Sequence, residues 1–338
     1  MDSVNRLIEL LYDRLGQSVS LDEAASAAGG RGKLEKLWPL VAQRGHRVVF
    51  SPAGACLVLP TAMDARLIER DLDTRRVGRN VICFPQVDST NDVAFDSASQ
   101  AGADGLAVLA EWQRLGRGRL GRRWISPPGA NVLLSVLLND PSEALGHEAL
   151  TIAAGLAVAE GIEDATNIPC RLKWPNDVLL EGRKVAGVLV ELRRSRKGRC
   201  VVIGIGVNAN AAPDSPDIQS PATCLAEHMG EPLDRTEIVR GLLRRLDGWV
   251  ARVEAADLDA LHTAWRDRCA MINQRIVVDS GGRQVTGRVL DISPLEGLIL
   301  CDDHGHRQHL PAACSTVVGI RRGEIEGKPR PPQRREKR

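Results

Sequence analysis

The first sixty residues place apolar side chains first at helical spacing and then at alternating spacing. Residues 4–15, VNRLIELLYDRL, have the period of an amphipathic helix. Ser20 and Glu23 have the spacing of a capping box, which predicts a second short helix that ends at Gly29-Gly30. Residues 31–44 predict a third helix, and residues 46–60, HRVVFSPAGACLVLP, predict two strands around a turn. Three helices and a hairpin indicate a winged helix-turn-helix domain over residues 1–62, although a generic helical cap domain would have the same composition.

The middle of the chain alternates apolar runs with helical patterns. Residues 63–80 are charged and predict a linker helix that ends near Gly78. An Ala-rich helix is predicted over 147–164, and another over 234–255, where Asp234 and Glu237 have capping-box spacing. Strands are predicted in the apolar runs 81–87, 105–110, 131–138, 184–192 and 200–208. These elements predict an α+β domain with a central mixed sheet over residues 81–270.

From residue 271 the pattern changes to short strands separated by glycines, among them Gly287 and Gly297. About five strands of ordinary length fit into residues 271–321, which predicts a small β-barrel. Residues 322–338 are polar, basic and proline-containing, and they predict a disordered tail with solvated charges.

The composition limits the classes of protein. The chain has 338 residues, enough for two or three domains, and no apolar run approaches the ~20 residues that span a bilayer. Its eight cysteines are scattered without a CxxC pair, which argues against a zinc site or a disulfide framework and favours the reducing cytoplasm. A net charge of +2 gives no general affinity for nucleic acid.

One loop is rich in glycine and arginine. The segment 111–124, EWQRLGRGRLGRRW, follows a predicted strand and precedes Ser126-Pro127-Pro128-Gly129. Glycine lets the backbone approach a ligand, and arginines donate to phosphate or carboxylate. Gly/Arg segments are also found in RNA-binding or merely solvated chains, but the position between two strands favours an ordered, closable ligand loop. The segment lacks GxxxxGK[ST] and is therefore not a Walker A loop.

Three further segments could line the same site. Residues 173–177, KWPND, and 184–191, KVAGVLVE, place lysine, amide and carboxylate groups around a turn, where they could hold phosphates, a metal ion and an amine; a plain hairpin with surface lysines is the alternative. Residues 201–208, VVIGIGVN, leave one strand face without side chains, for a flat ligand or for close strand packing. Residues 87–92, VDSTND, supply hydroxyls or simply cap a helix.

In this order the motifs DSTN, GRGRLGRRW, KWPND, KVAGVLVE and GIGVN resemble the biotin–protein ligases, over about residues 81–320. The resemblance implies a catalytic domain of the class II synthetase/biotin ligase type, an SH3-like C-terminal barrel and, with the N-terminal domain, the group that doubles as repressor. Lipoate ligases share the fold and a KxND-like element but are not expected to carry the arginine loop.

The resemblance also implies roles for individual residues. Arg119, Lys184 and Asp177 would be catalytic, Asp177 by orienting or deprotonating the acceptor amine. The segment 211–224 corresponds to a nucleotide-side loop. The biotin-binding residues would be Ser89, Thr90, Asn91, Gln113, Arg117, Gly118, Arg119 and Lys184. The residues on the ATP or adenylate would be Arg119, Arg122, Trp124, Lys173, Asn176, Lys184, Gly204, Gly206 and Asn208.

The chemistry implied is activation of the biotin carboxylate by ATP, followed by transfer to a lysine of a carboxylase carrier domain. Mg²⁺ would bind through the ATP phosphates, with Asp177 as the candidate protein ligand. A homodimer is a further implication of the family, whereas no membrane partner is expected. Two alternatives stay open: a biotin-sensing DNA-binding regulator without catalysis, and a ligase for lipoate or octanoate.

DNA binding is expected to be weak or absent. Residues 1–62 carry seven basic and six acidic side chains, a poor balance for neutralising phosphates. Pro39 lies in the expected recognition helix, where an interior proline costs ~3 kcal/mol. The tip of the expected wing, residues 52–55, is uncharged.

Overall fold

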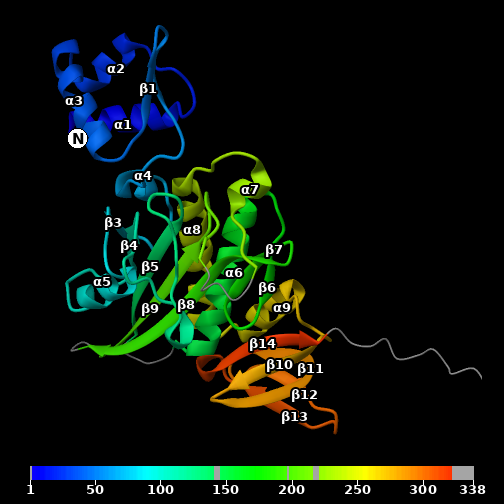
Figure 1. Ribbon diagram of the computed structural model, residues 1–338. Helices are drawn as coiled ribbons and strands as arrows, with labels where there is room; N and C mark the ends of the chain where they lie inside the picture. Colours follow the sequence, from blue (N-terminus) through cyan, green and yellow to red (C-terminus); the bar gives the residue numbers. More distant parts are fainter. Residues whose placement is uncertain (1, 141–144, 196–197, 216–220, 322–338) are drawn as a thin grey trace, which may run out of the picture.

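The computed structural model describes residues 2–140, 145–195, 198–215 and 221–321. At its N-terminal end, three helices pack beside a hairpin (Figure 1): α1 Ser3–Asp13, α2 Leu21–Ala28, α3 Arg31–Gln43, β1 Val48–Ser51 and β2 Gly54–Leu57. The predicted helices and hairpin are confirmed. The Ser20 side chain accepts a hydrogen bond from the Glu23 N–H and caps α2, and Gly29 ends it with a φ of 82°. Pro39 lies inside α3.

The linker helix predicted over 63–80 is wrong in its length. The structure has only α4 Ala65–Glu69, which is followed by extended backbone at Arg70 and by positive φ angles at Asp71 and Asp73. Beyond them, the backbone N–H groups of residues 75–77 all donate to the carboxylate of Asp247, at 2.8–2.9 Å. A carboxylate from another element thus takes the donors that a longer helix would have bonded internally.

A mixed sheet forms the centre of the molecule. In the described residues it has seven strands in the order β3-β4-β5-β9-β8-β7-β6, and only β3 and β4 are parallel neighbours. The strands are β3 Asn80–Phe84, β4 Leu106–Ala110, β5 Val132–Asp140, β6 Arg171–Lys173, β7 Asp177–Leu180, β8 Arg183–Ser195 and β9 Gly198–Val207. The predicted strands and the central mixed sheet are confirmed.

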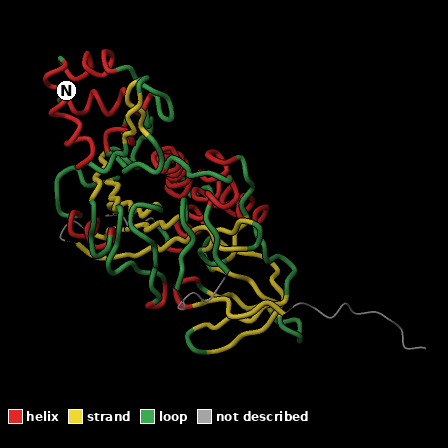
Figure 2. Tube along the Cα trace, turned by 45° about the horizontal axis from the view of Figure 1, so that its top comes forward, coloured by secondary structure: helices red, strands yellow, loops and turns green. Residues whose placement is uncertain are grey.

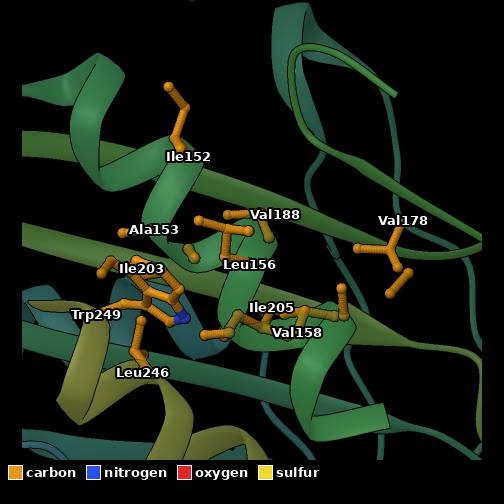
Figure 3. Packing of buried hydrophobic residues seen from close by; sticks show 14 of the residues in the cluster. Ile152, Ala153, Leu156, Val158, Val178, Val188, Ile203, Ile205, Leu246 and Trp249 are labelled. Atoms are coloured by element: carbon orange, nitrogen blue, oxygen red, sulfur yellow. The ribbon is translucent and has the colours of Figure 1, made fainter. Parts of the chain in front are cut away.

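Helices cover both faces of this sheet. They are α5 Thr90–Ser97, α6 His147–Thr166, α7 Leu225–Met229, α8 Arg235–Glu254 and α9 Leu258–Arg268. Helices α6 and α8 pack together, and their apolar side chains meet those of β8 and β9, as Figure 3 shows for Leu156, Val188 and Ile203. Val202, next in the strand after Ile203, instead belongs to the cluster under α5. Because strand residues alternate between faces, Gly204 and Gly206 share the α5 side with Val202.

The Asp234 side chain caps α8 by accepting from the Thr236 N–H at 2.9 Å, so the helix is capped as predicted but without the reciprocal bonds of a capping box. Asp234 also accepts a hydrogen bond from Tyr12 of α1. Next to it, the buried Arg235 donates to the carbonyl of Thr61 at 2.6 Å and to Glu111 at 2.6 Å. The start of α8 therefore joins the N-terminal helices to the central sheet.

The C-terminal part is an antiparallel sheet at the opposite end of the molecule from the N-terminal helices (Figures 1 and 2). In the described range its five strands are ordered β13-β12-β11-β10-β14. Their bounds are β10 Arg275–Ser280, β11 Arg283–Ser293, β12 Gly297–Cys301, β13 Arg307–Leu310 and β14 Ser315–Arg321, with the 3₁₀ turn η2 Ala312–Cys314 before β14. The predicted tail, residues 322–338, lies outside the described residues. Across the described ranges, none of the helices combines the length and apolar character required to cross a bilayer.

Candidate functional site

A cavity of about 380 Å³ opens where the arginine loop, the central sheet and the C-terminal sheet meet. This volume is in the range of small-molecule sites, ~300–1,000 Å³. Its wall combines the start of α5, the loop 113–124, the β6–β7 turn, strands β8 and β9, and residues 316–319 of β14. Residues of all five motifs thus share one cavity.

The start of α5 is held in the cavity wall by a polar network. Ser89 occupies the N-cap position without making a capping bond, so the plain capping interpretation does not hold. Instead, the Oε1 of Gln113 accepts from the N–H and the hydroxyl of Thr90, at 2.7 and 3.0 Å. Ser135, buried on β5, places its Oγ 2.7 Å from Thr90 Oγ1 and 2.5 Å from Asn91 Oδ1. Since these groups are buried and bonded, their orientation is fixed before any ligand binds.

The glycines of β9 make room for side chains of the protein. A Cβ on Gly206 would lie 2.3 Å from the indole of Trp124, and one on Gly204 would lie 2.5 Å from Asn91 Oδ1. The sequence had indicated a bare strand face, but in the structure Trp124 and Asn91 cover it. The Trp124 Nε1–H is buried and, among the described residues, has no hydrogen-bond acceptor. It is an available donor at the cavity wall.

Arg117 is bound to two carboxylates. It donates to Asp92 at 2.5 and 2.9 Å and to Glu191 at 3.2 Å. The guanidinium lowers the pKa of Asp92, and Asp92 in turn raises the pKa of Arg117. Glu191 also accepts from Asn91 at 2.6 Å, so it links the arginine loop to α5. Arg117 is consequently folded against the wall of the cavity.

Arg119 connects the loop to the rest of the cavity. Its Nη1 donates to Asn176 Oδ1 at 3.3 Å, and its Nη2 donates to the carbonyls of Ala312 and, at 2.8 Å, Ser315. Burial lowers the pKa of Arg119. Asn176 is itself fixed, because its Nδ2 donates to the Val188 carbonyl at 2.7 Å.

The β6–β7 turn places a carboxylate next to a lysine. Lys184 Nζ lies 2.5 Å from Asp177 Oδ1 and 5.6 Å from the centre of the Trp124 ring. The Lys184 backbone pairs with residue 222 of the predicted nucleotide-side loop, of which residues 216–220 lie outside the described residues. The ion pair and the indole form one side of the cavity.

Other cations at the cavity have no carboxylate partner. Arg122, Arg123 and Lys173 line it, and none of them forms an ion pair with a described residue. Three uncompensated charges beside one cavity favour an anionic ligand with several negative charges. No group of three or more His, Cys, Asp or Glu side chains is arranged to hold a metal ion in the part of the chain described.

The cavity brings together every predicted site residue except Asn208. Asn208 is buried at the end of β9, and its Nδ2 donates to the carbonyl of Thr223 at 3.0 Å. The pairing of Lys184 with residue 222 brings the carbonyl of Thr223 to the Asn208 amide, and a contact of Asn208 with the adenylate stays a prediction. Its Oδ1 has no partner in the described ranges.

Sequence reasoning missed Ser135, Arg123, the role of Glu191, and residues 316–319 of β14. Ser135 is one polar residue in the otherwise apolar run VLLSVLL, which is a signal that could have been used. The contribution of β14 had no comparable local signal.

Comparison with known proteins agrees with this geometry. The family model "Biotin/lipoate A/B protein ligase family" matches residues 83–208, which contain most of the cavity residues. A biotin–[acetyl-CoA-carboxylase] ligase from Mycobacterium tuberculosis is 35% identical over 264 residues, 74% of this chain and 95% of that protein. The solved biotin protein ligase from Aquifex aeolicus in complex with biotin and ATP has a TM-score of 0.62 and 30% identity, over 71% of this chain and 98% of that chain. The chain belongs to the biotin protein ligase family.

The match to the bifunctional ligase/repressor BirA of Bacillus subtilis is shorter. It is 34% identical over 206 residues, 60% of this chain, and the chain spans 61% of the length of that relative.

Proposed function

We propose that this protein is a biotin–protein ligase, which forms biotinyl-5'-AMP from biotin and ATP and transfers biotin to a lysine of a carboxylase carrier domain. The observation that carries the proposal is the cavity itself. A fixed polar wall, an arginine loop, Lys173 and a lysine–carboxylate pair line one space of about 380 Å³, and Lys173, Arg122 and Arg123 form no ion pair with a described residue. The names of the relatives support the same reaction, because they include biotin–[acetyl-CoA-carboxylase] ligases.

The polar wall suits the neutral head group of biotin. Ser89, Thr90, Asn91 and Gln113 offer donors and acceptors whose orientation the network with Ser135 fixes. In our proposal Arg117 and Gly118 close over this group. Closure requires Arg117 to exchange part of its contact with Asp92 for the ligand, so the ion pair would act as a resting position.

The cationic side suits the phosphates. A carboxylate oxygen of biotin attacks the α-phosphorus of ATP, and the bond to pyrophosphate breaks. Lys184 and Arg119 stabilise the charge that develops on the phosphoryl oxygens. Arg122, Lys173 and Asn176 bind the polyphosphate, while Trp124 and the glycines Gly204 and Gly206 shape the adenylate side.

Magnesium enters as part of the nucleotide substrate. The cation would be held through the phosphate oxygens of ATP, with Asp177 as the candidate protein ligand. Asp177 is bound to Lys184 in the structure.

The second half-reaction, transfer of biotin to the carrier lysine, uses Asp177 of the lysine–carboxylate pair. The mixed anhydride must be protected from water, which the closed arginine loop provides. The neutral amine of the carrier lysine attacks the acyl carbon, loses a proton and expels AMP. Asp177 is the carboxylate placed to orient that amine or accept its proton.

We propose a division into a winged helix-turn-helix unit (1–62), a linker (63–80), the catalytic unit (81–270) and an SH3-like barrel (271–321). The N-terminal unit is proposed to stabilise the catalytic unit rather than to read DNA. Val49 and Phe50 of its hairpin are 53% and 56% exposed, so the wing presents apolar side chains where phosphates require cations. Arg31 is already paired with Asp22. A homodimer remains a prediction.

The test is biotin-dependent ATP–pyrophosphate exchange in the presence of magnesium, followed by transfer of labelled biotin to a carrier domain. Exchange with biotin and none with lipoate or octanoate is expected. No exchange by well-folded protein would contradict the enzyme and favour a sensor, and exchange with lipoate alone would identify the sister ligase.

A further inference from the structure

The turn η2, Ala312–Cys314, is bound by charged side chains of two other elements. Arg119 of the arginine loop donates to the carbonyl of Ala312 and, at 2.8 Å, to that of Ser315. Glu148, in the first turn of α6, accepts from the N–H of Ala312 at 2.7 Å. The turn therefore donates to a carboxylate of α6 and accepts from a cation of the ligand loop.

The turn requires an acceptor from outside. A 3₁₀ turn begins with N–H groups that have no internal partner, and here Pro311 at the N-cap position has no side chain that can accept them. Glu148 supplies this acceptor although its own helix begins at an uncapped Gly146. The Glu148 side chain is 14% exposed. Its burial raises its pKa, and the N–H groups of Ala312 and Ala313 oppose that effect.

The position of the turn matters to the cavity for two reasons. First, the terminal nitrogens of Arg119 have three acceptors among the described residues, and two of these are the carbonyls of Ala312 and Ser315. Second, the turn leads directly into residues 316–319 of β14, which line the cavity. A shift of the turn would move a wall of the cavity and release Arg119 together.

We propose that Glu148 is a positioning residue for the acyl-adenylate: by holding η2, it fixes the carbonyls that hold Arg119 and so determines how long the adenylate stays in the cavity. Glu148 itself lies outside the cavity wall and acts through Arg119. This inference rests on the proposed function.

The test is a double-mutant cycle in the full chain, with Glu148→Ala, Arg119→Ala and the double variant. The measured quantity is the rate at which preformed biotinyl-adenylate, made with labelled biotin, leaves the protein. Glu148→Ala is expected to speed release about tenfold, the effect of losing one hydrogen bond to a charged group. In the Arg119→Ala background it is expected to add nothing, because residues that act through one contact are not additive.

Matched variants separate positioning from general destabilisation. Glu148→Gln keeps an acceptor oxygen and should release the adenylate at nearly the wild-type rate. Ala312→Pro removes the same hydrogen bond from the other side, since Pro311 already has the extended backbone, ψ 141°, that a following proline requires; it should match Glu148→Ala. Asp164 lies on α6, as Glu148 does, and forms a surface ion pair with Arg245 of α8. Asp164→Ala removes this pair and should behave as wild type.

Two results would overturn the inference: unchanged release by both Glu148→Ala and Ala312→Pro, or a full tenfold addition in the Arg119→Ala background. Absence of pyrophosphate exchange in the folded wild-type protein would instead overturn the proposed function and this inference with it. Exchange by the wild type with unaltered release by the variants overturns the inference alone.

Discussion

Replacing Lys184 by alanine separates a role in the chemistry from a role in the fold. The ion pair with Asp177 has a separation of 2.5 Å, and the two side chains are 27% and 19% exposed. This burial lies between that of surface pairs and fully buried pairs, so its loss should lower the free energy of unfolding by about 1–2 kcal/mol. For a unit of about 200 residues, each kcal/mol lowers the melting temperature by roughly 2–4 °C.

The effect on adenylation should be larger. Loss of one donor aimed at transition-state charge costs ~2.7–4 kcal/mol, or about 10²–10³ in rate. The assay is single-turnover formation of biotinyl-adenylate at saturating biotin and magnesium–ATP, together with thermal melting. Lys184→Met is the matched control, because it keeps an unbranched apolar stem but lacks the charge, and it should be as slow as Lys184→Ala.

Asp177→Asn completes the comparison. It breaks the same ion pair but leaves the lysine charge, so adenylation should persist while transfer to the carrier slows. If Lys184→Ala melted well below the wild type and still formed adenylate at the wild-type rate, the lysine would be structural and the reasoning above would be refuted.

Four further predictions concern other parts of the molecule. Arg119→Gly removes the bonds to Asn176 and the η2 carbonyls, so released adenylate should label many nearby lysines; labelling confined to the carrier lysine, seen by peptide mapping, would contradict this role. Gly206→Val should displace the Trp124 indole, which a Cβ would approach to 2.3 Å, and slow single-turnover formation of biotinyl-adenylate; an unchanged rate would show that the indole can move freely. Deleting residues 1–62 removes the Thr61 carbonyl that Arg235 binds, and should raise the KM for biotin while sparing single-turnover chemistry. The intact chain should bind operator-type DNA weakly in a salt titration. Tight, selective binding at physiological salt that strengthens with biotin and ATP would establish a ligase-repressor.

Local patterns in the sequence predicted most of the secondary structure. The apolar runs that became β5, β8 and β9 and the Ala-rich run of α6 carry their own periodicity, and Ser20 and Gly29 carry the signals of a helix start and end. The prediction of a helix over 63–80 was wrong because a residue far away in the sequence determines the conformation of this segment. Asp247, about 170 residues away, binds the N–H groups of residues 75–77. Nothing near Gly78 in the sequence encodes that contact.

In the site, too, the local motifs could be predicted and the contacts between distant segments could not. The motif residues could be assigned to one site from their order, but the contacts that orient them could not. Glu191 belongs to the motif KVAGVLVE, yet its bonds to Asn91 and Arg117 depend on strand β8 lying close to the start of α5 and to the arginine loop. The hydrogen bond from Asn208 to the Thr223 carbonyl likewise depends on the pairing of Lys184 with residue 222, which no local pattern encodes.

The bond between Arg119 and the carbonyl of Ala312 also sets an order of events during synthesis. The two residues are 193 positions apart, so at ~5–20 residues per second the ribosome adds Ala312 roughly 10–40 s after Arg119. Throughout that interval the arginine loop lacks two of the acceptors that hold it, even if the central sheet has already formed. The part of the cavity wall in β14 and the carbonyls that hold Arg119 are therefore completed together, only when the last strands have been made.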